Sequence, residues 1–144
     1  MKFFVSIILF LIISCNQNIV PEFNENRSFD FLIKQCEFGP RNPGSSGYQS
    51  FSIYLEKFLK EIDNENIIQN FNYLEHITGT KREGKNFIIQ FNKEAKKRML
   101  IGAHWDTRAL ADEDQDSEKN NLPILGANDG ASGVGLILEI LRTV

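Results

Sequence analysis

The sequence predicts an α/β fold, and three features of its apolar residues support this. Residues 48–63 repeat apolar side chains at helical spacing, while residues 67–73 and 86–92 are short runs rich in Ile and Phe. Residues 99–103 form a nearly continuous apolar run, typical of a strand buried on both faces of a helix-covered sheet. A chain of 144 residues is long enough for one domain or part of one. The formal net charge of −3 leaves no excess of Lys and Arg to neutralise phosphates, which argues against nucleic-acid binding.

Residues 1–14 are expected to be a lipoprotein signal peptide. Lys2 precedes an apolar run from Phe3 to Ile13 that is too short to cross a bilayer as a helix. The run ends in Ser14-Cys15, which resembles a bacterial lipobox with Cys15 as the lipidated residue. Residues 15–27 would then be a polar tether, and the protein an exported lipoprotein anchored to a bacterial membrane, in the periplasm or at the cell surface. The alternative is an ordinary secretory signal with a chance cysteine near its cleavage site.

Two helices are predicted after the tether. The first runs from about Ser28, its expected N-cap, to Phe38, and ends before Gly39-Pro40. Its apolar face consists of Phe29, Leu32, Ile33 and Cys36, so Cys36 is expected to be a buried small residue rather than a reactive thiol. The second helix runs from about Tyr48 to Asp63. Its buried face is expected to consist of Phe51, Tyr54, Leu55, Phe58, Leu59 and Ile62.

Three strands and a final helix are predicted in the rest of the chain. The strands are expected over Ile67 to Tyr73, Asn86 to Asn92 and Arg98 to Ala103, separated by a Thr-Gly-Thr turn and by a charged turn. The last helix runs from Ser132 to Val144. Its buried side chains are expected to be Val134, Ile137, Leu138 and Leu141.

Polar residues that suit metal binding follow the last predicted strand. His104 and Asp106 are two residues apart and would project from the same side of an extended chain. Ligands of open α/β sheets bind beyond the carboxyl ends of the strands, which is where these residues fall. Asp129 lies just before the last helix, so the intervening loop can return it to the same edge. Imidazole and carboxylate groups are the ligands of hydrolytic zinc sites.

Each of these residues also has an ordinary structural explanation. His104 could be a hydrogen-bonded histidine at a strand end, Asp106 a turn residue and Asp129 the N-cap of the last helix. The glycines after Asp129 match neither pattern of phosphate-binding loop. The acidic loop between the two motifs is by default a solvated charge run, although attraction of a cationic peptide N-terminus is a further hypothesis. A calcium loop is disfavoured because the sixth position holds no Gly. The acidic residues are Asp112, Glu113, Asp114, Asp116 and Glu118.

Taken together, these motifs resemble a known superfamily. The stretch His104-Trp105-Asp106-Thr107-Arg108, with Pro123 to Val134, is similar to the zinc aminopeptidases and glutaminyl cyclases, and more narrowly to the bacterial glutaminyl-peptide cyclotransferases. Phe38-Gly39-Pro40-Arg41 fits the same branch, and the resemblance runs from about Phe29 to the end of the chain. Ala109 and Tyr48 depart from the pattern, which has Pro and His there. The resemblance implies a three-layer sandwich in which helices flank a mixed, mostly parallel sheet, with residues 28–144 as its N-terminal part.

The resemblance also implies roles for three residues. Asp129 matches the zinc-binding carboxylate, which bridges two ions in the aminopeptidases and holds one in the cyclases. His104 matches a ligand of the second ion in the aminopeptidases that generally does not bind zinc in the cyclases. Asp106 matches a carboxylate that does not bind zinc itself but orients the residues that do. The Glu-Glu pair, a later Asp and a distal His of the family would lie beyond Val144, so this chain alone is expected to be inactive.

The implied function belongs to the whole protein. It is the conversion of the N-terminal Gln of peptides or proteins to pyroglutamate, with release of ammonia and with one Zn²⁺ ion. The alternative is an aminopeptidase that uses two Zn²⁺ ions to hydrolyse N-terminal residues. An alternative of another class is a non-catalytic, surface-binding lipoprotein on a degenerate enzyme fold. The oligomeric state is not predicted.

Overall fold

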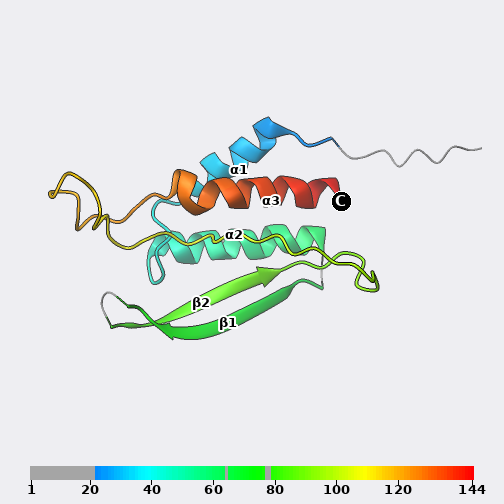
Figure 1. Ribbon diagram of the computed structural model, residues 1–144, viewed down its shortest axis with the longest axis horizontal. Coiled ribbons are helices and arrows are strands. Elements are labelled where there is room, and N and C mark those ends of the chain that lie inside the picture. The colour runs from blue at the N-terminus through cyan, green and yellow to red at the C-terminus, as the bar shows by residue number, and fades with distance from the viewer. Residues whose placement is uncertain (1–21, 64, 77–78) are drawn as a thin grey trace, which may run out of the picture.

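The computed structural model describes residues 22–63, 65–76 and 79–144 of the chain (Figure 1). In chain order the elements are α1 (Glu25–Glu37), α2 (Ser46–Ile62), β1 (Ile67–Leu74), β2 (Lys81–Ile88), the short turn η1 (Ala127–Ala131) and α3 (Ser132–Thr143). The predicted signal peptide and Cys15 lie outside the described residues. Within those residues, no helix combines the length and the apolar character needed to cross a membrane.

Helix α1 begins earlier than the sequence predicts. Its N-cap is Asn24, whose side-chain oxygen accepts a 2.9 Å hydrogen bond from the Arg27 backbone N–H. The predicted cap Ser28 is therefore wrong, and residues 25–27, expected at the end of the tether, are helical. The predicted buried face is also wrong, because Phe29 and Ile33 are exposed and Cys36 is half-buried.

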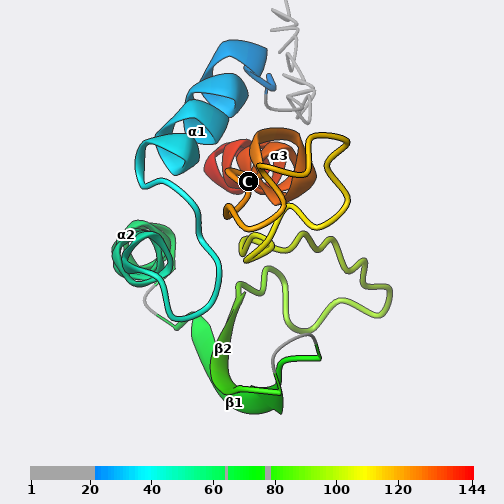
Figure 2. The same cartoon turned by 90° about the vertical axis from the view of Figure 1, so that its left-hand side faces the viewer.

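The helix instead turns Ser28 and Gln35 toward α3, which lies beside it (Figure 2). The Gln35 amide donates a 2.9 Å hydrogen bond to the carbonyl of Ala131 at the start of α3. A backbone contact and a buried hydrogen bond, which an apolar periodicity does not encode, thus set the rotation of α1.

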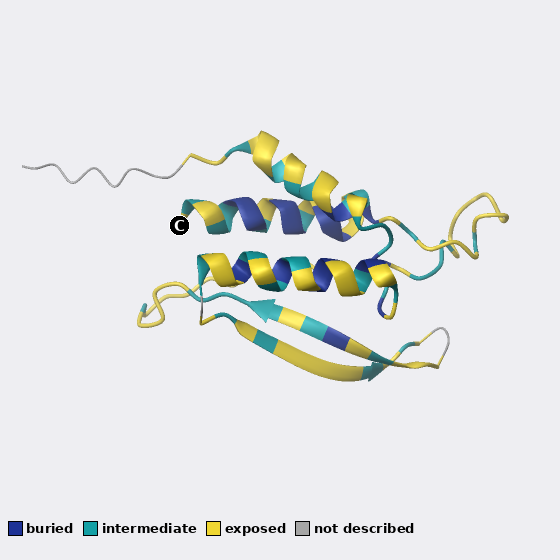
Figure 3. Cartoon of the chain, turned by 180° about the vertical axis from the view of Figure 1, so that it is seen from behind, coloured by how far each residue is buried: buried dark blue, intermediate teal, exposed yellow. Residues whose placement is uncertain are grey.

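Helix α2 confirms the prediction and starts two residues early. Ser45 is its N-cap, and the Ser45 hydroxyl accepts a 3.1 Å hydrogen bond from the Tyr48 N–H. Phe51, Leu55 and Leu59 are buried along one face, as the helical spacing predicts. This face packs into the core with Trp105, Val134 and Leu138. Figure 3 shows the buried stripes on α2 and α3.

Strands β1 and β2 form an antiparallel hairpin, with Ile67 opposite Ile88 and Leu74 opposite Lys81. The first strand is confirmed, but the second, predicted over residues 86–92, is wrong at both ends: it starts five residues earlier, at Lys81, and ends four residues earlier, at Ile88. Residues 81–85 look like a connection by composition, yet their backbones pair with β1. Gly84 lies opposite Phe71, whose ring occupies the space that a side chain at residue 84 would need. Pairing with a neighbour overrides side-chain polarity here.

The predicted strand over residues 98–103 does not form within the described part of the chain. These residues belong to no strand, and Met99 and Leu100 are 86% and 94% exposed. A strand buried on both faces needs neighbouring strands and covering helices. In the described residues the sheet has two strands, both in the hairpin, so the mostly parallel sheet implied by the resemblance is not formed among them.

The chain beyond that segment becomes buried at Trp105. The Trp105 ring lies 6.0 Å from that of Phe51 on α2 and 5.9 Å from that of Phe87 on β2. On the other side, Ala103 lies so near Gly133 of α3 that a Cβ added there would be 3.0 Å from the Ala103 Cβ. Residues 103–105 therefore run between α2 and α3 and lead directly into the predicted site residues.

Candidate functional site

The structure brings His104 and Asp129 together from two motifs 25 residues apart. The His104 Nε2 lies 2.9 Å from the Asp129 Oδ1. On the other edge of the ring, the His104 Nδ1 lies 3.0 Å from the backbone carbonyl of Asp106 and 3.6 Å from its Oδ1. The predicted convergence of the three residues at one place is thus observed. Their roles in binding a metal stay predictions.

A break in the backbone before α3 presents the Asp129 side chain. Asp129 has non-helical dihedral angles (φ −86°, ψ 102°), and Gly130 follows with φ +95°. A Cβ on Gly130 would lie 2.9 Å from the His104 Cε1, so glycine also makes room for the imidazole. The residue that caps α3 is Ala131, with no side-chain cap bond, which rules out Asp129 as an ordinary N-cap. The Asp129 carboxylate therefore does not cap α3.

The surroundings of His104 raise its pKa above the ordinary value. Partial burial lowers the pKa, but the hydrogen bonds to Asp129 and to the Asp106 carbonyl outweigh it, and both carboxylates add attraction. Since both ring nitrogens face oxygen acceptors, the doubly protonated imidazolium satisfies both contacts. Zinc binding through Nε2 would have to displace that proton. In the neutral imidazole, a proton kept on Nδ1 and donated to the Asp106 carbonyl would leave the Nε2 lone pair for a metal ion.

The donor types suit zinc, whereas their number is too small for a catalytic ion. A catalytic zinc ion normally has three protein ligands and an open position. No group of three or more His, Cys, Asp or Glu side chains in the described residues is arranged to hold a metal ion. The His104 and Asp129 side chains are 54% and 87% exposed, so further ligands have access to them. The described residues can thus supply one or two ligands of a larger site.

The sequence does not predict the role of Arg41, although Arg41 belongs to the Phe38-Gly39-Pro40-Arg41 motif of the resemblance. It follows the Gly39-Pro40 turn and is fully buried, with 0% exposure. Its Nε donates to the Trp105 carbonyl at 3.1 Å, and its Nη2 to the Gly126 carbonyl at 3.2 Å. Burial lowers the pKa of Arg41, while Cys36 and Asp106 oppose this effect. A loop residue in a Gly- and Pro-rich stretch gives no periodicity from which such burial could be predicted.

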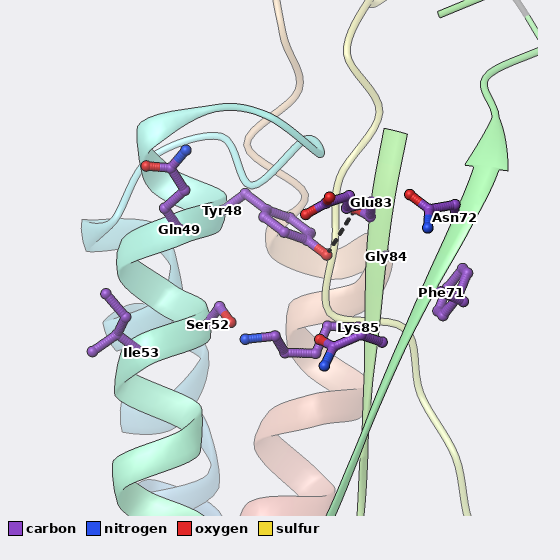
Figure 4. A pocket seen from close by; sticks show the side chains of 10 residues that line it. Tyr48, Gln49, Ser52, Ile53, Phe71, Asn72, Glu83, Gly84 and Lys85 are labelled. Atoms are coloured by element: carbon purple, nitrogen blue, oxygen red, sulfur yellow. Dashed lines mark hydrogen bonds between the residues drawn. The ribbon is translucent and has the colours of Figure 1, made fainter. Parts of the chain in front are cut away.

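Tyr48 occupies the position where the family pattern has His, and it packs against Trp105, the residue between His104 and Asp106. Its ring stacks on that of Trp105 with the centroids 4.2 Å apart. Burial raises the pKa of Tyr48, and the nearby charge of Asp106 adds to this rise. Tyr48 also lines a groove of about 480 Å³ between α2 and the hairpin, in which the Ser52 hydroxyl is buried without a hydrogen-bond partner among the described residues (Figure 4).

Three of the five carboxylates of the acidic loop form ion pairs with two basic neighbours. Arg108 contacts Asp112 at 2.9 Å and Glu113 at 3.4 Å, and Lys119 contacts Asp116 at 3.1 Å. These pairs are exposed, as expected of a solvated charge run. Among the described residues of this loop, no three carboxylates lie as they would around a metal ion.

Comparisons with known proteins identify the family of the chain. Residues 86–144 match the model of peptidase family M28. A Zn-dependent exopeptidase from Parabacteroides distasonis is 39% identical to the chain and superposes with a TM-score of 0.80. The glutaminyl cyclase of Bacteroides thetaiotaomicron is also 39% identical, with a TM-score of 0.79. The chain belongs to the superfamily of zinc exopeptidases and glutaminyl cyclases.

The superfamily relatives do not share one activity. A leucine aminopeptidase precursor from Bacteroides thetaiotaomicron is 40% identical to the chain, with a TM-score of 0.75. Each of these three superpositions covers 85% of this chain and 42% of the relative, so the chain spans less than half the length of the superfamily structures it matches. No curated protein matches the chain in sequence.

Proposed function

We propose that the complete gene product is a zinc-dependent glutaminyl-peptide cyclotransferase. The observation that carries this proposal is the 2.9 Å contact between the His104 Nε2 and the Asp129 Oδ1, because this contact would orient the carboxylate that the resemblance assigns to zinc. The similarity to the glutaminyl cyclase of Bacteroides thetaiotaomicron, at 39% identity, supports the reaction class. The proposed substrates are peptides or proteins with an N-terminal Gln.

In this proposal the residues of the chain bind and orient. Asp129 would hold the zinc ion, His104 would orient the Asp129 carboxylate, and Asp106 would fix the His104 ring through its carbonyl. Bound zinc supplies Lewis-acid polarisation of the substrate's side-chain amide. The substrate's own N-terminal amine attacks that amide carbon, and ammonia leaves. The proposal requires further ligands and a proton-shuttling Glu from outside these 144 residues, together with the mostly parallel sheet of the superfamily.

A di-zinc aminopeptidase is the second candidate. It is favoured by the position of the His104 imidazole beside Asp129, which suits a ligand of a second ion, and by the similarity to the leucine aminopeptidase precursor at 40% identity. The two candidates differ in what His104 does. His104 is a ligand in the aminopeptidase and orients Asp129 in the cyclase.

The reaction is tested on the complete gene product with a Gln-initiated tripeptide and a Leu-initiated tripeptide. Ammonia release from the first without shortening of either peptide supports the cyclase. Release of free Leu supports the aminopeptidase instead. Zinc is counted in the same preparation, with one ion expected for the cyclase and two for the aminopeptidase. Absence of both reactions together with absence of bound zinc would leave the non-catalytic binding protein.

Two variants make the assignment of residues testable. Asp129→Asn should abolish activity and zinc binding under either candidate function. His104→Ala should keep one zinc per chain in a cyclase and lose one of two in an aminopeptidase. Asp30→Asn and His76→Ala are matched controls, because both residues are exposed and lie outside the contacts of the site. A fully active Asp129→Asn variant would contradict both candidate functions.

We further propose that the protein is an exported lipoprotein anchored through Cys15 to a bacterial membrane. The support is the apolar run that ends in Ser14-Cys15. Metabolic labelling with a radioactive fatty acid should mark the wild-type protein and should not mark a Cys15→Ala variant. Label on both proteins, or on neither, contradicts lipidation at this residue.

A further inference from the structure

Arg41 connects three separate segments of the chain through backbone carbonyls. Its Nη1 donates to Gln35 at 3.1 Å and to Gly39 at 3.3 Å, at the end of α1. Its Nε and Nη2 reach Trp105 and Gly126, as described above. Trp105 lies between His104 and Asp106, and Gly126 lies three residues before Asp129. One guanidinium therefore holds both segments that carry the candidate site.

The backbone of Arg41 adds to this connection. Its N–H donates to the Thr107 hydroxyl at 2.8 Å, and the Thr107 N–H donates back to the Arg41 carbonyl at 3.3 Å. The Gly126 carbonyl accepts a second hydrogen bond, from the Ala131 N–H at 3.2 Å. Thr107 in turn packs so closely on Gly126 that a Cβ there would lie 2.4 Å from the Thr107 Cγ2. The segment after His104 and the turn before Asp129 are thus in contact through Arg41 and Thr107.

Such an arrangement needs a guanidinium. No carboxylate of the described residues forms an ion pair with Arg41. Its buried charge is stabilised by carbonyl dipoles and by the Phe51 ring, 5.7 Å away, with a longer-range attraction to Asp106. The planar group has five N–H donors in a fixed fork, whereas a Lys ammonium has three donors at one point. Lys at this position could not reach carbonyls on opposite sides of the group at once.

We propose that Arg41 is a positioning residue that sets the distance between His104 and Asp129. It acts through the Trp105 and Gly126 carbonyls and touches neither side chain itself. Its importance for activity rests on the proposed function, whereas its effect on the geometry of the site does not.

The test is made on the 144-residue chain, in which Trp105 is the one tryptophan and so reports on the site without a label. Arg41→Lys should shift the Trp105 emission to longer wavelength well below the melting temperature. It should also accelerate hydrogen exchange of the Thr107 and Ala131 amides by roughly tenfold or more, while the Asp63 amide at the end of α2 keeps its wild-type rate. Arg27→Lys is the matched control, because it makes the same substitution at a guanidinium that donates two side-chain hydrogen bonds to Glu139 and none to the site.

Exchange of Thr107 and Ala131 in step with Asp63, with an unchanged Trp105 spectrum, would reduce Arg41 to a general stabiliser and overturn the proposal. If Arg41→Lys does not fold, Thr107→Val is the variant to use, since it removes only the hydroxyl that accepts from Arg41. Faster exchange at Ala131 in that variant supports the proposal, and a wild-type rate overturns it. Neither zinc nor substrate enters these readouts, so a failure of the proposed function leaves their outcome unaffected.

Discussion

The guanidinium of Arg27 forms a two-point hydrogen bond with the carboxylate of Glu139. The Nη2–Oε1 distance is 2.8 Å and the Nε–Oε2 distance is 3.1 Å. The Asn24 N–H donates to the same carboxylate at 3.1 Å, so Glu139 contacts both the cap and the first turn of α1. The Glu139 side chain is 0% exposed and is therefore a buried anion. Its nearest cations are Arg27 of α1 and Arg142 in the last turn of α3.

Replacing Arg27 by Met should destabilise the protein, because it leaves the Glu139 carboxylate buried with one backbone donor. We expect a fall of several degrees in the melting temperature, followed by circular dichroism. Arg142→Met is the matched control. The Arg142 Nε lies 3.9 Å from the same carboxylate, too far for a hydrogen bond, so its loss should matter less. Equal effects of the two variants would show that the two-point geometry is unimportant.

The same carboxylate predicts a loss of stability in acid. The hydrogen bond from Arg27 lowers the pKa of Glu139 below the ordinary 4.5, although burial opposes part of this effect. Its contribution to the free energy of unfolding is therefore complete above that value and lost as the pH falls through the lower pKa of the folded state. Urea unfolding of the wild type and Glu139→Gln between pH 6 and 3 measures this. The stability difference between them should shrink in acid, and a constant difference contradicts the assignment.

Gly130→Ala should disturb the site as well as the fold. At φ +95° an Ala is strained, and its Cβ would also meet the His104 ring. Gly79→Ala is the matched control, since Gly79 has φ +67° with nothing within 4 Å, and should cost about 1–2 kcal/mol from backbone strain. We expect a larger loss for Gly130→Ala in urea unfolding, with displaced His104 ring signals in NMR spectra. Equal losses with unchanged signals would mean that the ring does not need this glycine.

Gly135→Ala should weaken the contact between α1 and α3. Its Cβ would lie 2.6 Å from the Ser28 carbonyl oxygen, which belongs to the backbone and cannot rotate away. We expect a loss of about 1–3 kcal/mol in urea unfolding, in spite of the better helix propensity of Ala. Gly133→Ala provides the comparison, because its new contact is with the Ala103 Cβ at 3.0 Å and relaxes more easily. Stabilisation by Gly135→Ala would refute the close approach of the two helices.

Elements with a strong internal pattern could be predicted from the sequence, and elements that depend on distant partners could not. Helices α2 and α3 follow from one apolar face each. The start of β2 depends on pairing with β1, and the rotation of α1 depends on Gly135 and on the Ala131 carbonyl. Residues 99–101 were expected to be buried because they are apolar, but burial also requires neighbouring strands. An apolar run does not by itself show that such strands are present.

The candidate site divides in the same way. The spacing of His104 and Asp106 and the position of Asp129 before a helix predicted that they would meet, and they do. The resemblance to a superfamily supplied their proposed roles. The buried guanidinium of Arg41 could not be predicted, because its partners are four backbone carbonyls. Every residue type has a backbone carbonyl, so the sequence does not show which ones accept a hydrogen bond from Arg41.

The exposure of Met99, Leu100 and Ile101 has a colloidal consequence. Their segment pairs with no strand in the described residues, and an unpaired apolar segment of backbone is a template for cross-strand association between molecules. Lys96, Lys97 and Arg98 directly precede it and are exposed, so like charges oppose the approach of a second copy. Since 0.1 M salt largely screens this repulsion at separations beyond about 10 Å, the solubility of the chain should fall as ionic strength rises.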